Sequence, residues 1–159
     1  MGRALSAGVL LYRLGTGGTP EVLIGHPGGP FWARKDEGAW SIPKGEYDSG
    51  EDPWEAAQRE FEEELGLPVP AGSHIDLGVI TQPSGKRLRV FAVNADLDIS
   101  EMHSNTVTLE WPRGSGRICE FPELDRVAWL PVTAARSKLL NGQRPILDLL
   151  VAAIASKGP

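Results

Sequence analysis

The sequence has few of the side chains that small proteins use for cross-links or metal centres. A single cysteine, Cys119, stands among 159 residues, which excludes an intramolecular disulfide and a cysteine-based zinc cluster. We expect this cysteine to be a small packing side chain rather than a reactive thiol. The three histidines, His26, His74 and His103, show no spacing typical of metal ligands. We therefore assign them no role.

Long apolar runs and an excess of positive charge are also missing. No stretch approaches the roughly 20 apolar residues of a membrane span, and the first residues, MGRALSAGVLLYR, lack the long apolar region of a signal peptide. We expect a cytoplasmic protein with no membrane partner. The net charge of −5 disfavours nucleic acid as a partner, because nonspecific binding to it needs a basic surface. A small phosphorylated ligand needs only a few local cations or a bound metal.

The length and the hydrophobic pattern predict one α/β domain over residues 1–159. A chain of 159 residues, 41% of them hydrophobic, is long enough for one globular core. Apolar residues at helical spacing over 133–154, interrupted by NGQRP, predict two helices. Short apolar runs bounded by turn residues predict strands over 6–13, 21–25, 74–82, 87–97 and 126–130. This order predicts a mixed sheet covered by helices.

Two segments lack a clear pattern. The 26–40 loop is rich in Gly and Pro and carries Trp32 and Trp40. It is either a lid or binding loop, or a surface connection whose aromatic side chains pack on the core. The run ICEFPELDRVAWLP is expected to be a loop that leads to a strand and carries Glu120, Glu123 and Asp125.

Residues 53–65 give the strongest local signal in the chain. Asp52 is placed to cap a helix that begins at Pro53, and Glu55 completes a capping-box arrangement. Gly66, followed by Leu67 and Pro68, ends the helix. One stripe of this helix is apolar and is expected to face the core: Trp54, Ala57, Phe61 and Leu65.

Three carboxylates, Glu60, Glu63 and Glu64, gather on one flank beside that stripe. Like charges at this spacing cost a few tenths of a kcal/mol per pair when exposed, and more when buried. A solvated acidic face is the simpler explanation. Such faces usually interleave Lys, however, and here only Arg59 is available. A hard divalent cation such as Mg²⁺ explains the cluster better, since it takes oxygen ligands.

The residues from Gly45 to Leu67 read G-x5-E-x7-R-E-F-E-E-E-L-G-L. This segment resembles the signature of the Nudix hydrolases, G-x5-E-x7-R-E-U-x-E-E-x-G-U, where U is a bulky apolar residue. Phe61 at the first U is the least typical choice. The resemblance implies an α/β/α sandwich with a mixed central sheet. It also implies Mg²⁺-dependent hydrolysis of a nucleoside diphosphate linked to another moiety, with Mn²⁺ as a possible substitute.

The resemblance assigns roles residue by residue. It implies that Glu60, Glu63 and Glu64 bind the metal together with the backbone carbonyl of Gly45. Glu51 and Arg59 resemble the supporting pair that orients the loop and its glutamates, and Gly66 is part of the structural motif. The general base varies in position within the family. Glu60 is our candidate inside the motif and Glu123 our preferred candidate outside it.

The substrate is less well defined. The run WSIPKGE is similar to the W-x-x-P-K-G entry of Nudix branches that hydrolyse diadenosine polyphosphates, diphosphoinositol polyphosphates or oxidised nucleoside triphosphates. Lys44 either contacts a substrate phosphate or pairs with nearby acids such as Glu46. Arg87, with its neighbours Lys86 and Arg89, is a further candidate for phosphate binding. The candidates for stacking on a base are Trp40, Trp32, Trp111 and Phe31.

Two other functional classes remain open at this stage. A Nudix-like module could sense a nucleotide without cleaving it, although the intact motif argues against this. A protein-interaction domain could use the acidic helix to dock a basic partner. A homodimer is compatible with either class and with the enzyme.

Overall fold

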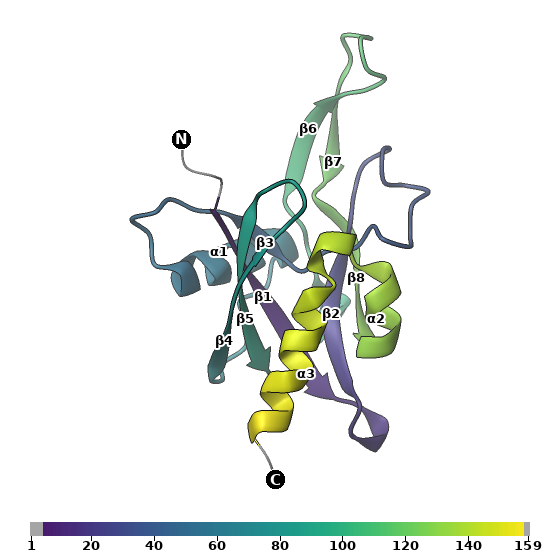
Figure 1. Ribbon diagram of the computed structural model, residues 1–159. Coiled ribbons are helices and arrows are strands. Elements are labelled where there is room, and N and C mark those ends of the chain that lie inside the picture. Colours follow the sequence, from purple (N-terminus) through teal and green to yellow (C-terminus); the bar gives the residue numbers. More distant parts are fainter. Residues whose placement is uncertain (1–4, 158–159) are drawn as a thin grey trace.

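The computed structural model describes residues 5–157 and consists of a central sheet, a separate two-stranded ribbon and three α-helices (Figure 1). The strands are β1 (Leu5–Leu14), β2 (Pro20–Pro27), β3 (Lys44–Glu46), β4 (His74–Thr81), β5 (Arg87–Asn94), β6 (Thr106–Glu110), β7 (Ile118–Pro122) and β8 (Leu124–Pro131). The helices are α1 (Pro53–Leu65), α2 (Val132–Lys138) and α3 (Pro145–Lys157), with short 3₁₀ turns η1 (Thr16–Gly18), η2 (Ile99–Glu101) and η3 (Asn141–Gln143). Among residues 5–157, no helix is long and apolar enough to cross a bilayer.

The sheet is mixed, as predicted. Its strand order is β4-β5-β1-β2-β8, and β3 also pairs with β1. β1 runs parallel to β5, whereas its pairings with β2 and β3 are antiparallel. β1 is buried along most of its length, because helices cover both faces of the sheet at this strand. A strand buried on both faces needs a nearly continuous apolar run, and SAGVLLY supplies it.

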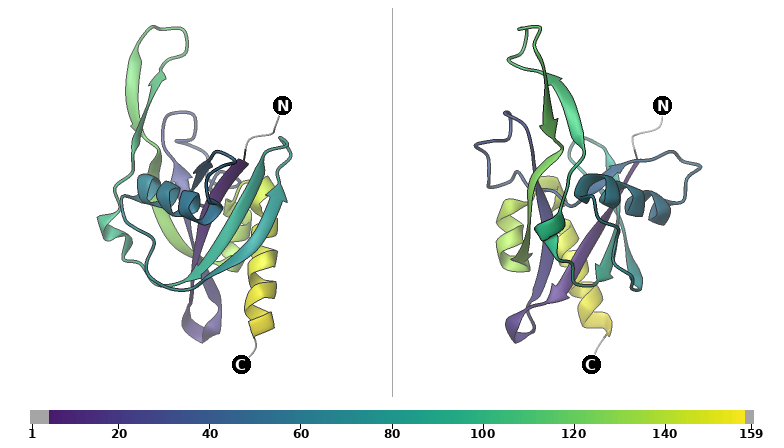
Figure 2. Two further views of the ribbon diagram at one scale, coloured as in Figure 1. Left: turned by 90° about the vertical axis from the view of Figure 1, so that its left-hand side faces the viewer. Right: turned by 180° about the vertical axis from the view of Figure 1, so that it is seen from behind.

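Helices pack on both faces of the sheet and so form the expected α/β/α sandwich (Figures 1 and 2). Side chains alternate along β1. Val9 and Leu11 belong to the core cluster that contains Phe61 and Leu65 of α1. Leu10 belongs to the other cluster, which also contains Leu139, Ile146, Leu147 and Leu150 from α3 and the segment after α2.

The predicted helix α1 is confirmed with its boundaries. The Asp52 side chain accepts a hydrogen bond from the backbone N–H of Glu55, and Gly66 adopts a left-handed conformation with φ of 73°. The predicted apolar stripe is buried except for Trp54, which is only half-buried and stacks on His74 with 3.9 Å between ring centroids. Helix α1 is therefore fixed at both ends and along one face.

Three strands are missing from the sequence prediction. β3 is only three residues long. β6 and β7 form a ribbon that projects from the rest of the molecule (Figure 1). Glu120 lies within β7 and Asp125 within β8, so their assignment to a loop is wrong, and only Glu123 falls between the two strands. The ribbon was missed although Val107 and Leu109 alternate with polar residues, because each strand has only five residues and the run ICEFP was assigned to a loop.

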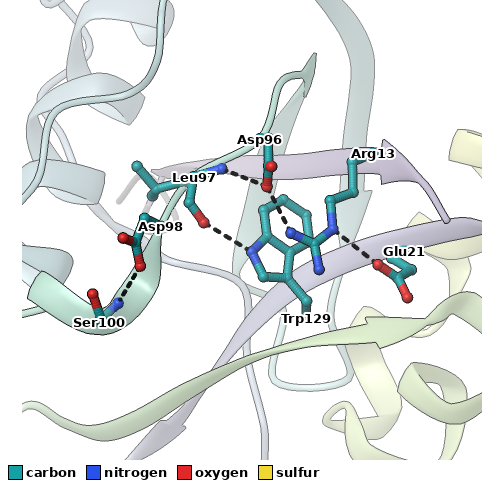
Figure 3. Close-up of polar contacts among 7 residues, drawn as sticks. All are labelled: Arg13, Glu21, Asp96, Leu97, Asp98, Ser100 and Trp129. Carbon is teal, nitrogen blue, oxygen red and sulfur yellow. Dashed lines mark hydrogen bonds and ion pairs between the residues drawn. The ribbon is translucent and has the colours of Figure 1, made fainter.

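A cluster around Arg13 ties together three strands and the segment after β5 (Figure 3). The Arg13 guanidinium stacks over the Trp129 ring at 4.1 Å from its centroid. Its Nε donates to Glu21 at 2.9 Å and its Nη1 donates to Asp96 at 2.6 Å. The indole N–H of Trp129 donates to the carbonyl oxygen of Leu97 at 3.1 Å. One planar cation thus holds β1, β2 and β8 against the connection that leaves β5.

We expect Arg13→Ala to lower the melting temperature by about 2–4 °C, the shift for loss of ~1 kcal/mol of stacking and hydrogen bonding in a chain of this length. Arg13→Lys should lose less, because it keeps the charge but not the planar fork. The control is Arg136→Ala, which breaks only an exposed ion pair with Asp148. Equal shifts for Arg13→Ala and Arg136→Ala in a thermal unfolding experiment would contradict the structural role of Arg13.

Candidate active site

Arg59 lies among three of the predicted motif carboxylates. Its guanidinium forms an ion pair with Glu51, lies 3.1 Å from Glu60 Oε2 and 3.8 Å from Glu63 Oε1. The same group donates to the backbone carbonyl of Glu46 at 3.4 Å. This position explains how one cation offsets the repulsion among the glutamates of α1, which the sequence left uncompensated.

Glu64 is the one buried acid of the motif, with 7% of its surface exposed. Burial raises the pKa of its carboxyl to about 9, and the neighbouring Glu123 adds to this through its charge and a hydrogen bond. The charge of Lys44 and a hydrogen bond from its backbone act in the opposite direction. Glu64 and Glu123, 59 positions apart, therefore form an acid pair in which Glu64 holds a proton at neutral pH in the metal-free protein.

Glu60 lies between these two groups of charges. Burial raises the pKa of its carboxyl, and the charges of Glu63 and Glu123 act in the same direction, whereas Arg59 opposes them. The Glu60 side chain also covers Gly45, because a Cβ at that position would collide with its carboxylate. Any larger residue at position 45 would displace Glu60, which explains the need for glycine there.

β1 and β2 separate over part of their length, and this separation lets Lys44 and Gly45 lie beside the glutamates of α1. β1 pairs with β2 only over its last residues, and Ser6–Gly8 pair instead with β3. The run 41–46 fills the gap, with backbone hydrogen bonds between Gly25 and Ser41 on one side and from Val9 to Pro43 on the other. The sequence WSIPKGE is thus an extended segment inserted between β1 and β2, and its last three residues form β3, which lies against α1.

A pocket of ≈ 220 Å³ opens beside the acid pair. One part of its lining is charged and contains Lys44, Glu64 and Glu123. The remaining lining is mostly apolar: Pro27, Trp32, Ala39, Ser41, Leu124 and Leu140. A second, polar pocket of ≈ 340 Å³ is lined by Glu46, Tyr47, Asp48, Glu51 and Arg59.

The structure brings only some of the predicted substrate residues to the pocket. Lys44 and Trp32 line it. Trp40 is buried elsewhere, with its indole N–H donating to Asp36 at 2.8 Å. Arg87 pairs with Leu5 at the start of β5 and lines neither of the two pockets. Substrate contact by Trp40 and Arg87 stays a prediction.

The donor set suits a hard cation, although it is not assembled around one. Among residues 5–157, no three His, Cys, Asp or Glu side chains are arranged closely enough to hold a metal ion. Glu60 is turned to Arg59, and Glu63 is exposed. The buried Glu64 carboxyl, whose pKa is raised in the metal-free protein, nevertheless marks a place where positive charge is favoured, and the candidate ligands are carboxylate and carbonyl oxygens, as Mg²⁺ prefers. The residues therefore fit a divalent cation.

The relation to known proteins extends over nearly the whole chain. The family model of the NUDIX domain matches residues 2–150. The chain belongs to the Nudix family. The RNA pyrophosphohydrolase of Rhodospirillum rubrum is 29% identical over 175 residues, covering 95% of this chain and 92% of that protein. The RNA pyrophosphohydrolase of Rhizobium meliloti is 31% identical over 130 residues, covering 73% and 72%.

The fold agrees with solved Nudix structures. A mutT/nudix family protein from Listeria innocua superposes with a TM-score of 0.65 at 20% identity, covering 99% of this chain and 97% of that one. Family membership and the hydrolase relatives together make this Nudix protein a pyrophosphate hydrolase. This result favours the enzyme over the sensing module and the docking domain considered from the sequence.

The raised pKa of Glu64 predicts a pH-dependent cost in stability. Its ordinary value is 4.5 and its folded value about 9, so the metal-free protein loses stability as the pH rises between these values. We expect Glu64→Gln to melt close to the wild type at about pH 5 in EDTA and well above it at about pH 9. The matched control is Glu62→Gln, an exposed neighbour on α1. Parallel pH curves for wild type and Glu64→Gln would contradict the buried position.

Proposed function

We propose that this Nudix hydrolase cleaves nucleoside or dinucleoside polyphosphates in a Mg²⁺-dependent reaction. The observation that carries the proposal is the pocket in which Lys44, Glu64 and Glu123 adjoin an apolar wall with Trp32. With a divalent cation on the carboxylates, phosphates suit the charged part, and a base suits the aromatic wall. At ≈ 220 Å³ the pocket is smaller than the ~300–1,000 Å³ of typical ligand sites. It therefore holds part of such a substrate.

The cation would be held by Glu60, Glu63, Glu64 and the carbonyl oxygen of Gly45, with Mn²⁺ as a substitute for Mg²⁺. When bound, it supplies charge neutralisation for the diphosphate and a water of lowered pKa. Glu63 must rotate toward the other two glutamates, which its exposed position permits. Arg59 and Glu51 restrict the orientations of these carboxylates and act as positioning residues.

The chain's own residues then divide the remaining work. The Lys44 ammonium binds a phosphate oxygen as a point charge. The Glu123 carboxylate takes the proton of the attacking water, because it lies in the pocket beside Glu64. Glu60 is the alternative base inside the motif, although the hydrogen bond that it accepts from Arg59 restrains its carboxylate.

Product analysis tests this function. The purified protein with Mg²⁺ is incubated with diadenosine polyphosphates, nucleoside triphosphates including oxidised guanine forms, ADP-ribose, NADH and a diphosphoinositol. We expect cleavage of a nucleoside polyphosphate class, lowered at least about 100-fold in Glu63→Gln and Glu64→Gln, which corresponds to ~3 kcal/mol. Glu62→Gln should keep full activity. Nucleotide binding without cleavage by the wild type would favour the sensing module instead.

A second candidate substrate is the 5′-triphosphate end of RNA. The two relatives with broad coverage carry the name RNA pyrophosphohydrolase, and the β6–β7 ribbon offers a surface next to the pocket. Such a substrate would overturn the expectation that the chain has no nucleic-acid partner. The net charge of −5 disfavours binding along a long polyanion, but a short end needs only local cations.

The ribbon combines aromatic and cationic side chains. Trp111 near its tip is 39% exposed, and Phe31 on the neighbouring loop is 58% exposed. Among the described residues, Arg113 and Arg117 form no ion pair, and the Glu110 carboxylate instead accepts from the N–H groups of the tip. Each strand of five residues extends ~17 Å. The tip of the ribbon is thus several nucleotide lengths, rather than one, from the base of the ribbon next to the pocket.

Ribbon variants separate the two substrates. We expect Trp111→Ala to raise KM about tenfold for a 5′-triphosphorylated oligonucleotide, the effect of losing one stacked base. KM for a free nucleoside triphosphate should be unchanged. Thr108→Ala in β6 is the matched control, because it faces away from Trp111. Equal KM values for Trp111→Ala and wild type on the oligonucleotide would rule out the ribbon as a resting surface for RNA.

A further inference from the structure

His26 is a fully buried polar side chain in β2 with a partner on each ring nitrogen. Its Nδ1 lies 2.9 Å from Oδ1 of Asp125 in the adjacent strand β8. Its Nε2 lies 2.6 Å from the carbonyl oxygen of Lys35, in the loop 28–39 that follows β2. The Trp40 ring packs against the imidazole edge, with 5.3 Å between centroids. The ring therefore bridges a strand and a loop inside the core.

Both partners of this ring are hydrogen-bond acceptors. A backbone carbonyl only accepts, and the Asp125 side chain is partly exposed, with a carboxylate oxygen 3.8 Å from the Arg126 guanidinium. Each ring nitrogen lies within hydrogen-bond distance of one partner, so the imidazole joins β8 to the loop.

The Lys35 contact restrains the middle of the loop. The start of the loop is fixed by the Gly28 N–H, which donates to the carbonyl oxygen of Glu123 at 3.0 Å. Its end is fixed by the Gly38 N–H, which donates to the carbonyl oxygen of Ser137 at 2.9 Å. In the part of the chain that the structure describes, the only hydrogen bond from outside the loop to residues 29–35 comes from His26.

This restrained segment carries a wall of the pocket. The Lys35 N–H donates to the carbonyl oxygen of Trp32 at 2.9 Å, which closes a turn. Trp32 lines the pocket on one side and Glu123 on another. Asp125, the second partner of His26, follows Glu123 by two residues at the start of β8. The imidazole thus connects the two chain segments that define the pocket's width.

We propose that His26 is a positioning residue that ties the Trp32 wall of the pocket to the Glu123 wall. Loss of its two ring contacts loosens the loop, so KM rises while kcat changes little. The effect on KM rests on the function proposed above, whereas the restraint on the loop does not.

Amide hydrogen exchange and kinetics test the positioning role with His26→Gln and Asp125→Asn. We expect the Lys35 amide to lose at least about tenfold of its protection in His26→Gln, while the Gly38 amide keeps its own. In both variants KM should rise several-fold and kcat should stay within about twofold. Unchanged protection at Lys35, or a fall in kcat alone, would contradict the proposal. If no substrate is hydrolysed even by the wild type, the proposed function fails, and the exchange result decides this inference.

Discussion

The burial of one carboxyl, that of Glu64, is the constraint on which the site depends. A carboxyl this deeply buried is tolerated only when it is protonated or lies beside a cation or a strong hydrogen-bond donor. Here it faces a second acid, Glu123. Helix α1 therefore has to be held firmly against the sheet. Phe61 and Leu65 anchor it in the core, while its N-terminal cap and Gly66 fix its ends. Without that packing, Glu64 would turn to solvent and lose its contact with Glu123.

The remaining motif residues follow from the same constraint. Because Glu64 points inward, its neighbours Glu60 and Glu63 lie closer to the protein surface, where Arg59 restrains them. The close approach of α1 to β3 places the Glu60 side chain directly over Gly45. Glycine at that position is thus a packing requirement as well as a motif residue. The cost of burying a charged carboxylate is thus largest at Glu64, where a bound divalent cation would lower it.

The sequence predicted the parts of the site that depend on local signals. Capping residues, the apolar stripe and the spacing of the glutamates lie within about 20 residues, so helix α1 and its acidic flank were recognisable. Contacts between distant segments were not. Glu64 meets Glu123, and His26 meets Asp125 across 99 positions. A lone histidine in an apolar run carries no signal of such a partner. The choice between Trp32 and Trp40 likewise depends on how the loop 28–39 folds back.

The two sides of the pocket are therefore held by different kinds of interaction. The acidic side rests on a long, capped helix packed in the core, which resists small changes in conditions. The Trp32 side rests on a loop fixed at its two ends and, between them, by one hydrogen bond from His26. Chemistry at the phosphates needs the fixed side, because misplacement of reacting groups is costly. Recognition of the nucleoside tolerates the adjustable side, since stacking on an aromatic ring accepts a range of positions. Substitutions in the loop 28–39 and the β6–β7 ribbon can thus change substrate preference while the carboxylates keep their places.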